Sequence, residues 1–265
     1  MRLPNELGIG AVVRRGLVAV LAVAILCAGG AARAANTQVA VAANFTEPAK
    51  EIAAAFKART GDTATLSFGS SGQFYSQIAH GAPFEVFLSA DAERPQVAEK
   101  DGLAVAGTRF TYAVGRLVLY STTPGLADGG AAVLKAGKFA KLSIADPAAA
   151  PYGAAAIQTL TRLGLYDVLK PKIVQGASIA QAYQFVDTGA ADLGFVALSQ
   201  VINVPAGSRW TVPAANHAPI EQQAVLLRAG QDKAAAKAFL AFLKSPQAVA
   251  IIRKYGYEVK WAGNL

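Results

Sequence analysis

The stretch QVAVAANFTEPAKEIAAAFKA, residues 38–58, decides the fold. Its first six residues, 38–43, are mostly apolar, which predicts a buried strand. Residues 47–58 predict a helix with Pro48 in its first turn, where a missing N–H does no harm. A buried strand that leads directly into a helix is the building unit of an α/β protein.

The same alternation of apolar strands and Ala-rich helices continues outward from this stretch. In the first third of the chain we expect a strand at 63–68, a helix at 71–80 and a strand at 84–88. The middle of the chain predicts strands at 142–144, 172–174 and 193–196, with helices at 153–163 and 180–188. Two last helices, at 233–243 and 246–255, are expected to pack back on the first set. The pattern predicts an α/β fold.

Two extended apolar stretches, residues 112–121 and 224–227, separate the first α/β set from the second. We expect them to cross between two lobes. The predicted first lobe comprises residues 35–115 and 225–265, and the predicted second lobe comprises 116–224. Two such lobes form a cleft lined by strand ends and helix starts, where open α/β sheets bind their ligands.

Residues 1–34 predict a cleavable secretory signal peptide. Two arginines precede the apolar stretch 16–27, and the small-residue exit Ala-Arg-Ala at 32–34 predicts cleavage after Ala34. The apolar stretch is shorter than the roughly 20 residues of a membrane span.

Two other export routes are weaker interpretations of the same segment. Cys27 would carry the lipid of an anchored precursor, but Leu26 stands where a small residue is required. The arginine pair at 14–15 is typical of twin-arginine export, but the rest of that pattern is missing. We therefore expect ordinary secretion.

Removal of residues 1–34 from the 265-residue chain leaves 231 residues, and Cys27 is the only cysteine. The processed chain therefore has no disulfide, no cysteine metal site and no thiol nucleophile. The formal net charge falls from +8 to +5, because four arginines and one glutamate leave with the signal. The basic residues do not cluster, so nucleic-acid binding is not expected.

Four loops that lead from strands into helices contain no charged residue and no histidine: residues 43–46, 69–72, 150–153 and 177–179. They provide hydroxyls, one amide side chain and the free N–H groups of a helix's first turn. Together with the helix dipole, such N–H groups form an anion site. Each loop taken alone is more simply an N-cap or a turn.

The absence of charge in these loops narrows the ligand class. A carboxylate ligand usually requires an arginine fork, and an amino acid also requires an acidic residue. A phosphate that keeps one proton would need an acceptor, which only a backbone carbonyl or Asp91 could supply. A fully deprotonated dianion such as molybdate, tungstate or sulfate needs only donors, so the loops predict a small dianion in a cleft.

Longer segments resemble a known family, the periplasmic molybdate-binding proteins. The segments that carry the resemblance are VAVAANF (39–45), GSSGQFYSQI (69–78), GAPFEVFLSAD (81–91), GTRFTYAVGRLVLYS (107–121), APYG (150–153) and GAADLGFVALSQ (189–200). The resemblance covers essentially all of the chain after residue 34. It implies a two-lobed, type II-like periplasmic binding protein fold and a monomer that delivers molybdate or tungstate to an ABC transporter permease, with no cofactor.

The resemblance also implies ligand positions. It places the oxyanion against the Asn44 amide, the Ser71 hydroxyl and N–H, and the N–H groups of Tyr152 and Ile179. Ala43 stands where relatives often have Ser or Thr, so only its backbone can contribute. A further position, Ala197, lacks a tyrosine donor that another branch of the family has.

Three alternatives remain: one keeps the class of binding protein, and two belong to other classes. A binding protein for another oxyanion such as sulfate would have the same donors. A serine hydrolase would use Ser71, but residues 69–73 are not the G-x-S-x-G elbow, and the two histidines, His80 and His217, are expected at the surface. A transcription regulator with such lobes would begin with a DNA-binding segment, where this chain has the predicted signal peptide. We expect no enzyme activity and no metal ligands.

Overall fold

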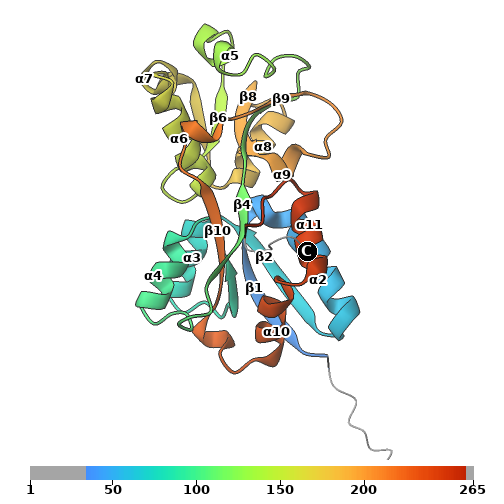
Figure 1. Ribbon diagram of the computed structural model, residues 1–265. Helices are drawn as coiled ribbons and strands as arrows, with labels where there is room; N and C mark the ends of the chain where they lie inside the picture. The colour runs from blue at the N-terminus through green and yellow to red at the C-terminus, as the bar shows by residue number, and fades with distance from the viewer. Residues whose placement is uncertain (1–33, 261–265) are drawn as a thin grey trace, which may run out of the picture. The chain divides into compact units, whose positions relative to one another are not determined.

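The computed structural model describes residues 34–260, and those from Ala35 onward belong to one compact unit. The predicted signal peptide lies outside these residues except for Ala34, so its cleavage stays a prediction. Two five-stranded sheets organise the unit (Figure 1). We use first lobe and second lobe for each sheet with the helices packed on it.

The sheet of the first lobe has the strand order β2-β1-β3-β10-β4. Its strands are β1 (Asn36–Ala42), β2 (Thr63–Gly69), β3 (Val86–Leu88), β4 (Phe110–Gly115) and β10 (Ile220–Leu226). β1 is parallel to β2 and β3, whereas β10 is antiparallel to β3 and β4. The parallel part therefore directs the carboxyl ends of β1, β2 and β3 to one edge.

The sheet of the second lobe has the same layout, with the strand order β7-β6-β8-β5-β9. Its strands are β5 (Leu117–Ser121), β6 (Leu142–Ala145), β7 (Ile173–Gly176), β8 (Leu193–Ala197) and β9 (Ser208–Thr211). β6 is parallel to β7 and β8, and β5 is antiparallel to β8 and β9. Each lobe thus has four strands that run in one direction and one strand, β10 or β5, that runs opposite to them.

Helices follow the strands in both lobes. The first lobe has α2 (Thr46–Thr60), α3 (Ser71–Ala79), α4 (Glu93–Lys100), α10 (Ala234–Phe242) and α11 (Pro246–Lys254), with short 3-10 turns η1 (Ala43–Phe45) and η4 (Arg228–Gly230). The second lobe has α5 (Ala131–Ala136), α6 (Pro151–Arg162), α7 (Tyr166–Leu169), α8 (Ile179–Asp187) and α9 (Leu198–Val201), with η2 (Lys170–Lys172) and η3 (Ala214–Asn216). The predicted two-lobed α/β fold is confirmed.

The stretch that opens the fold is buried as its composition predicts. Val39 and Val41 of β1 belong to the core of the first lobe, and α2 contributes Ile52 and Phe56. Phe56 makes edge-to-face contacts with two phenylalanines of α10, at ring-centroid distances of 5.3 and 5.6 Å. The C-terminal helices therefore pack on the first lobe as expected.

The predicted crossover at residues 112–121 consists of two strands, β4 and β5, which belong to different sheets and are separated by Arg116. The chain returns to the first lobe between β9 and β10, and Figure 1 shows β4 and β10 side by side where the lobes meet. β10 starts at Ile220, so residues 220–224 are paired with β4 in the first sheet, although the predicted second lobe extends to residue 224. The exact lobe limits stay a prediction.

Within residues 34–260, no single helix is long and apolar enough to cross a membrane. Only α10 and α11 taken together, across a bend of 59°, would satisfy the requirement for length and composition.

Candidate functional site

The start of α3 contributes a hydroxyl and an N–H group. Ser70 caps this helix: its Oγ accepts the N–H of Gln73, while the Gln73 side chain accepts the Ser70 N–H. The N–H of Gly72 donates to Ala149 O at 2.8 Å. Of the first-turn donors, Ser71 N–H is therefore the one without a partner among the described residues. Ser71 is almost fully buried.

The Ser71 hydroxyl is held in a particular orientation. Its Oγ accepts the N–H of Ala90 at 2.9 Å, from the segment that follows β3. Because this contact uses an oxygen lone pair, the hydroxyl proton is free to be donated to another group. Ser71 thus presents two donors, its O–H and its N–H.

The starts of α6 and α8 repeat this arrangement in the second lobe. In α6, Pro151 has no N–H, and Gly153 and Ala154 both donate to Ala150 O, which leaves the N–H of Tyr152. In α8, Ser178 Oγ accepts the N–H of Gln181, which leaves those of Ile179 and Ala180 at the helix start. Tyr152 and Ile179 are both buried.

The structure brings the predicted site residues together. Ala43, Tyr152 and Ile179 lie in one buried cluster, which also contains Ala90, the residue bonded to Ser71. The turn η1, which holds Ala43 and Asn44, contacts α8 and α9 of the second lobe. The N–H of Gly72 in α3 donates to Ala149 O, directly before α6, and η1 contacts α8, so the helix starts of the two lobes approach one another at the lobe interface.

The Asn44 side chain has a different role from the one expected. Its amide Nδ2 donates to Gln222 Oε1 at 2.8 Å and to the Tyr257 hydroxyl at 2.9 Å. Both amide hydrogens are therefore engaged within the protein. The remaining donor of Asn44 for a ligand is its backbone N–H. That Asn44 binds the ligand stays a prediction, and its backbone N–H is the group that would make the contact.

These bonds belong to a buried polar network centred on Gln222. Gln222 Oε1 also accepts the Tyr112 hydroxyl at 3.0 Å, and its Nε2 donates to the Tyr152 hydroxyl at 3.2 Å. Gln222 and Tyr112 lie on adjacent strands of the first lobe, whereas Tyr152 belongs to α6 of the second. The network therefore links the lobes directly behind the helix starts.

Glycine is required where this network crosses the lobe interface. A Cβ on Gly115, at the end of β4, would overlap the Tyr152 hydroxyl and lie 2.7 Å from Gln222 Nε2. The absence of a side chain at Gly115 lets Tyr152 reach Gln222. This explains the glycine within the crossing segment.

Sequence reasoning missed Gln222 and Tyr257. The only available signal for Gln222 was a glutamine pair inside the apolar strand IEQQAVL, which marks polar groups that need buried partners. Tyr257 has no local pattern, and its partner Asn44 is 213 residues away.

Burial governs the electrostatics of the network. Desolvation raises the pKa of the Tyr112 and Tyr152 hydroxyls well above the usual value, and raises that of Tyr257 to about 12. All three phenols are therefore neutral hydrogen-bond donors at physiological pH. No Lys, Arg, Asp or Glu lies among the buried residues described, and the half-buried ion pair of Arg94 and Asp91 lies beside Gly72 at the start of α3.

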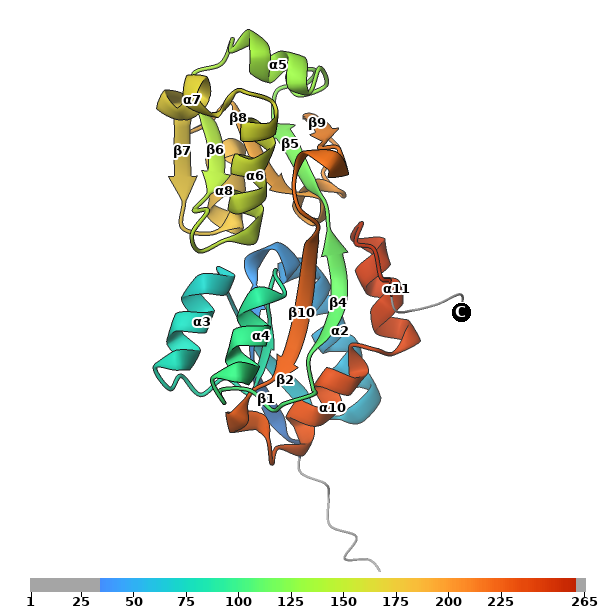
Figure 2. The same ribbon diagram turned by 60° about the vertical axis from the view of Figure 1, so that its left-hand side comes forward.

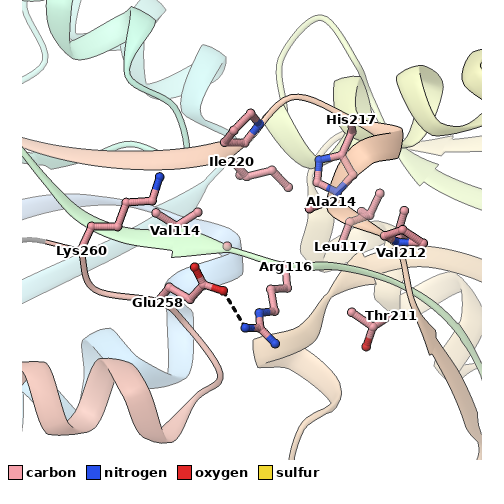
Figure 3. Close-up of a pocket in the computed structure, with 13 residues that line it drawn as sticks. Val114, Arg116, Leu117, Thr211, Val212, Ala214, His217, Ile220, Glu258 and Lys260 are labelled. Atoms are coloured by element: carbon pink, nitrogen blue, oxygen red, sulfur yellow. Dashed lines mark hydrogen bonds and ion pairs between the residues drawn. The ribbon is translucent and has the colours of Figure 1, made fainter.

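Two of the cavities in the described part of the chain have residues of both lobes in their walls. One, of about 430 Å³, is next to the crossing strands, where Arg116 donates to Glu258 at 2.6 Å and His217 lines the wall (Figure 3). The other, of about 740 Å³, opens between the lobes beside Asp91 and Arg94. Neither is lined by the predicted site.

Hydrolase and metal chemistry find no support in the geometry of the described residues. His80 Nδ1 lies 2.7 Å from Ser76 O and His217 Nδ1 lies 2.7 Å from Ala218 O, so neither histidine is bonded to Ser71. Within residues 34–260, no group of three or more His, Cys, Asp or Glu side chains could hold a metal ion. Unused buried donors where two α/β lobes meet are typical of a ligand-binding protein.

Comparisons with known proteins agree with this class. The family model of bacterial extracellular solute-binding proteins matches residues 37–258. The molybdate-binding protein of Rhodobacter capsulatus is 59% identical over 226 residues, which cover 85% of this chain and 89% of that protein. The molybdate-binding protein of Azotobacter vinelandii is 56% identical over 233 residues, with 87% and 92% covered.

A solved structure extends the likeness to three dimensions. The periplasmic molybdate-binding protein of Azotobacter vinelandii superposes with a TM-score of 0.82 and 44% identity, covering 84% of this chain and 99% of that one. The chain therefore belongs to the bacterial extracellular solute-binding protein family, in the group of the molybdate-binding proteins.

Proposed function

We propose that the protein is the solute-binding component of a molybdate or tungstate uptake transporter and holds the dianion between its two lobes. The observation that carries this proposal is the convergence of three buried helix starts, each with a first-turn N–H that the described chain does not use. The molybdate-binding names of two relatives above 50% identity support it.

In this site, Ser71 donates through its hydroxyl and N–H, and Tyr152 and Ile179 donate through their N–H groups. Asn44 and Ala43 contribute only backbone donors from η1. The positive ends of α3, α6 and α8 face the anion and favour negative charge. Because no acceptor side chain faces it, a dianion without a proton fits best. Among such dianions, we expect the spacing of the donors to favour molybdate and tungstate over the smaller sulfate.

The proposed role in transport also implies a location, a partner and an oligomeric state. We infer that residues 1–34 direct secretion to the periplasm and are then removed. The loaded protein docks as a monomer on the membrane permease of an ABC transporter, and it uses no cofactor. Its partners are the oxyanion and that permease, and nucleic acid is not among them.

Calorimetric titration with molybdate, tungstate, sulfate and phosphate tests the ligand assignment. The proposal predicts tight binding of the first two and weak or absent binding of the others. Sulfate bound as tightly as molybdate would overturn the molybdate assignment.

Replacement of two adjacent serines tests the site. Ser71→Ala removes one donor to the anion, and since a hydrogen bond to a charged group contributes about 1.5–3 kcal/mol, the affinity falls by about 10- to 100-fold. Ser70→Ala removes only the cap of α3, which costs about 1 kcal/mol of stability. Calorimetry and thermal unfolding of both variants separate the effects.

Ser70→Ala is the matched control because both variants also disturb the start of α3. Ser71→Ala leaves the Ala90 N–H unpaired, so both variants are expected to melt earlier than the wild type. Only Ser71→Ala is expected to lose affinity beyond threefold. Equal affinities in the two variants would place the anion elsewhere.

A further inference from the structure

Tyr257 extends into the lobe interface from the segment that follows α11. Its neighbour Glu258 pairs with Val114 of β4, with N···O distances of 2.8 and 3.1 Å. The Tyr257 ring packs edge-to-face on Phe45 at a centroid distance of 5.3 Å, and the residue is 5% exposed. The backbone pairing fixes the ring in the first lobe, with its hydroxyl at the interface.

The Tyr257 hydroxyl is shared by the two lobes. It lies 2.9 Å from Asn44 Nδ2 and 2.8 Å from Asn44 O, both in η1 of the first lobe. It also lies 2.9 Å from Ser199 Oγ in α9 of the second lobe. Ser199 Oγ in turn donates to Asn44 O at 2.8 Å. The Tyr257 hydroxyl, Ser199 Oγ and Asn44 O therefore form a closed ring of polar contacts.

This ring of hydrogen bonds affects the predicted anion site because it fixes the position of Asn44. The Tyr257 hydroxyl accepts from the Asn44 amide and donates its one proton to Ser199 Oγ, which in turn donates to the Asn44 carbonyl. The peptide groups of η1 are therefore fixed where the predicted anion site needs their N–H groups. Separation of the lobes would remove Ser199 and open the ring on one side.

We propose that Tyr257 is a positioning residue that couples oxyanion binding to lobe closure, because its hydroxyl holds Asn44 in place and joins it to Ser199 across the interface. The proposal rests on the proposed function. The ring of Tyr257 requires only apolar contacts, which phenylalanine would also make. Of the two parts of the Tyr257 side chain, only the hydroxyl bonds to Ser199 of the second lobe.

Tyr255 supplies a matched control for Tyr257→Phe. It lies two residues away, and its hydroxyl is 3.0 Å from Glu51 Oε2, within the first lobe. Tyr257→Phe and Tyr255→Phe each remove one phenol oxygen that is hydrogen-bonded. Only the first removes a contact between the lobes.

The first arm of the experiment measures molybdate binding by calorimetry and dissociation by stopped-flow fluorescence. Tyr257→Phe is expected to raise Kd about 10-fold, mainly through faster dissociation, whereas Tyr255→Phe stays within twofold of the wild type. A Kd for Tyr257→Phe within twofold of the wild type would overturn the coupling.

The second arm measures the distance between lobes without ligand. The only cysteine of the chain is Cys27, in the predicted signal peptide, so the processed protein can be labelled at Gln77→Cys in α3 and Thr161→Cys in α6. Energy transfer between the dyes is expected to fall in Tyr257→Phe and not in Tyr255→Phe. Unchanged transfer in both contradicts the proposal. If the wild type binds no molybdate, the proposed function fails, and this arm still decides the role of Tyr257.

Discussion

The two lobes meet in two regions of contrasting chemistry. The inner contact, defined by Asn44, Ser199, Tyr257, Gln222 and Tyr152, consists of buried neutral groups that satisfy one another. The outer contact consists of donors at the edge of the interface that reach the backbone carbonyls of Ala148 and Ala149. Figure 2 shows α3 and α4 of the first lobe on the side of α6.

Because the inner contact is more deeply buried than the outer contact, the free-energy cost of breaking it is larger. A buried polar group that loses its partner costs about 1–3 kcal/mol, whereas a hydrogen bond that water can replace contributes about 0.5–1.5 kcal/mol. The inner contact therefore makes the larger contribution to closure. The outer contact adds precision: a Cβ on Gly72 would lie 2.9 Å from the Ala149 Cα, so only glycine permits this approach.

The largest effect is expected from Gln222→Leu, which breaks the inner contact at its centre. The variant deprives Asn44, Tyr112 and Tyr152 of a buried partner, so the free energy of unfolding falls by about 3 kcal/mol or more. Urea denaturation measures this loss, and titration measures the accompanying loss of affinity.

The adjacent Gln223 provides the control for Gln222→Leu. Its side chain bonds to Arg109 and Thr111, all within the first lobe. Gln223→Leu is expected to lower stability less and to leave molybdate affinity within about twofold of the wild type. Equal losses of affinity in the two variants would contradict the special role of the inner contact.

The second largest effect is expected from alkaline pH, which ionises Tyr257 and so weakens the inner contact. The pKa of Tyr257 is raised to about 12 by burial, whereas an unfolded tyrosine titrates near 10. Between these values the unfolded chain binds fewer protons than the folded one, so stability is intact below about pH 10 and falls as pH rises toward 12. The loss attributable to Tyr257 is about 2 kcal/mol at pH 12 and approaches about 2.7 kcal/mol above that pH.

Urea denaturation of the wild type and Tyr257→Phe between pH 8 and 12 checks this dependence. The wild type is expected to lose stability more steeply above pH 10 than the variant, in which that phenol is absent. Parallel curves would show that Tyr257 is not protected from ionisation by the fold.

The smallest effect is expected at the outer contact. Arg94 donates to Ala148 O at 2.8 Å and is held by an ion pair with Asp91. Because both ends of this contact are accessible to water, Arg94→Ala is expected to change stability by less than about 1 kcal/mol and Kd by no more than about threefold. Calorimetry and thermal unfolding check both values, and a loss larger than that of Gln222→Leu would reverse the order of the two contacts.

The helix starts could be predicted from sequence because their chemistry is local. Ser70 and Ser71 stand directly before and at the start of α3, and Pro151 marks the first turn of α6. Strand periodicity likewise predicted β1, β2 and β8 closely. Local patterns are therefore sufficient for the donors and for the order of the elements.

The inner contact could not be predicted because its members come from distant parts of the chain. Asn44 is 178 residues from Gln222 and 155 from Ser199. An amide before a helix is equally typical of a cap, a ligand donor and a buried network. Only the tertiary structure showed that the Asn44 amide is already engaged, which moves its predicted contribution from the side chain to the backbone.

Titration of the wild-type protein with molybdate and with sulfate under identical conditions tests the central claim most directly. The account predicts saturable one-to-one binding of molybdate, stabilisation against thermal unfolding, and affinity for sulfate lower by at least about 100-fold. Sulfate affinity equal to that of molybdate, or no binding of either dianion, would contradict a donor-only site shaped for the larger oxyanion.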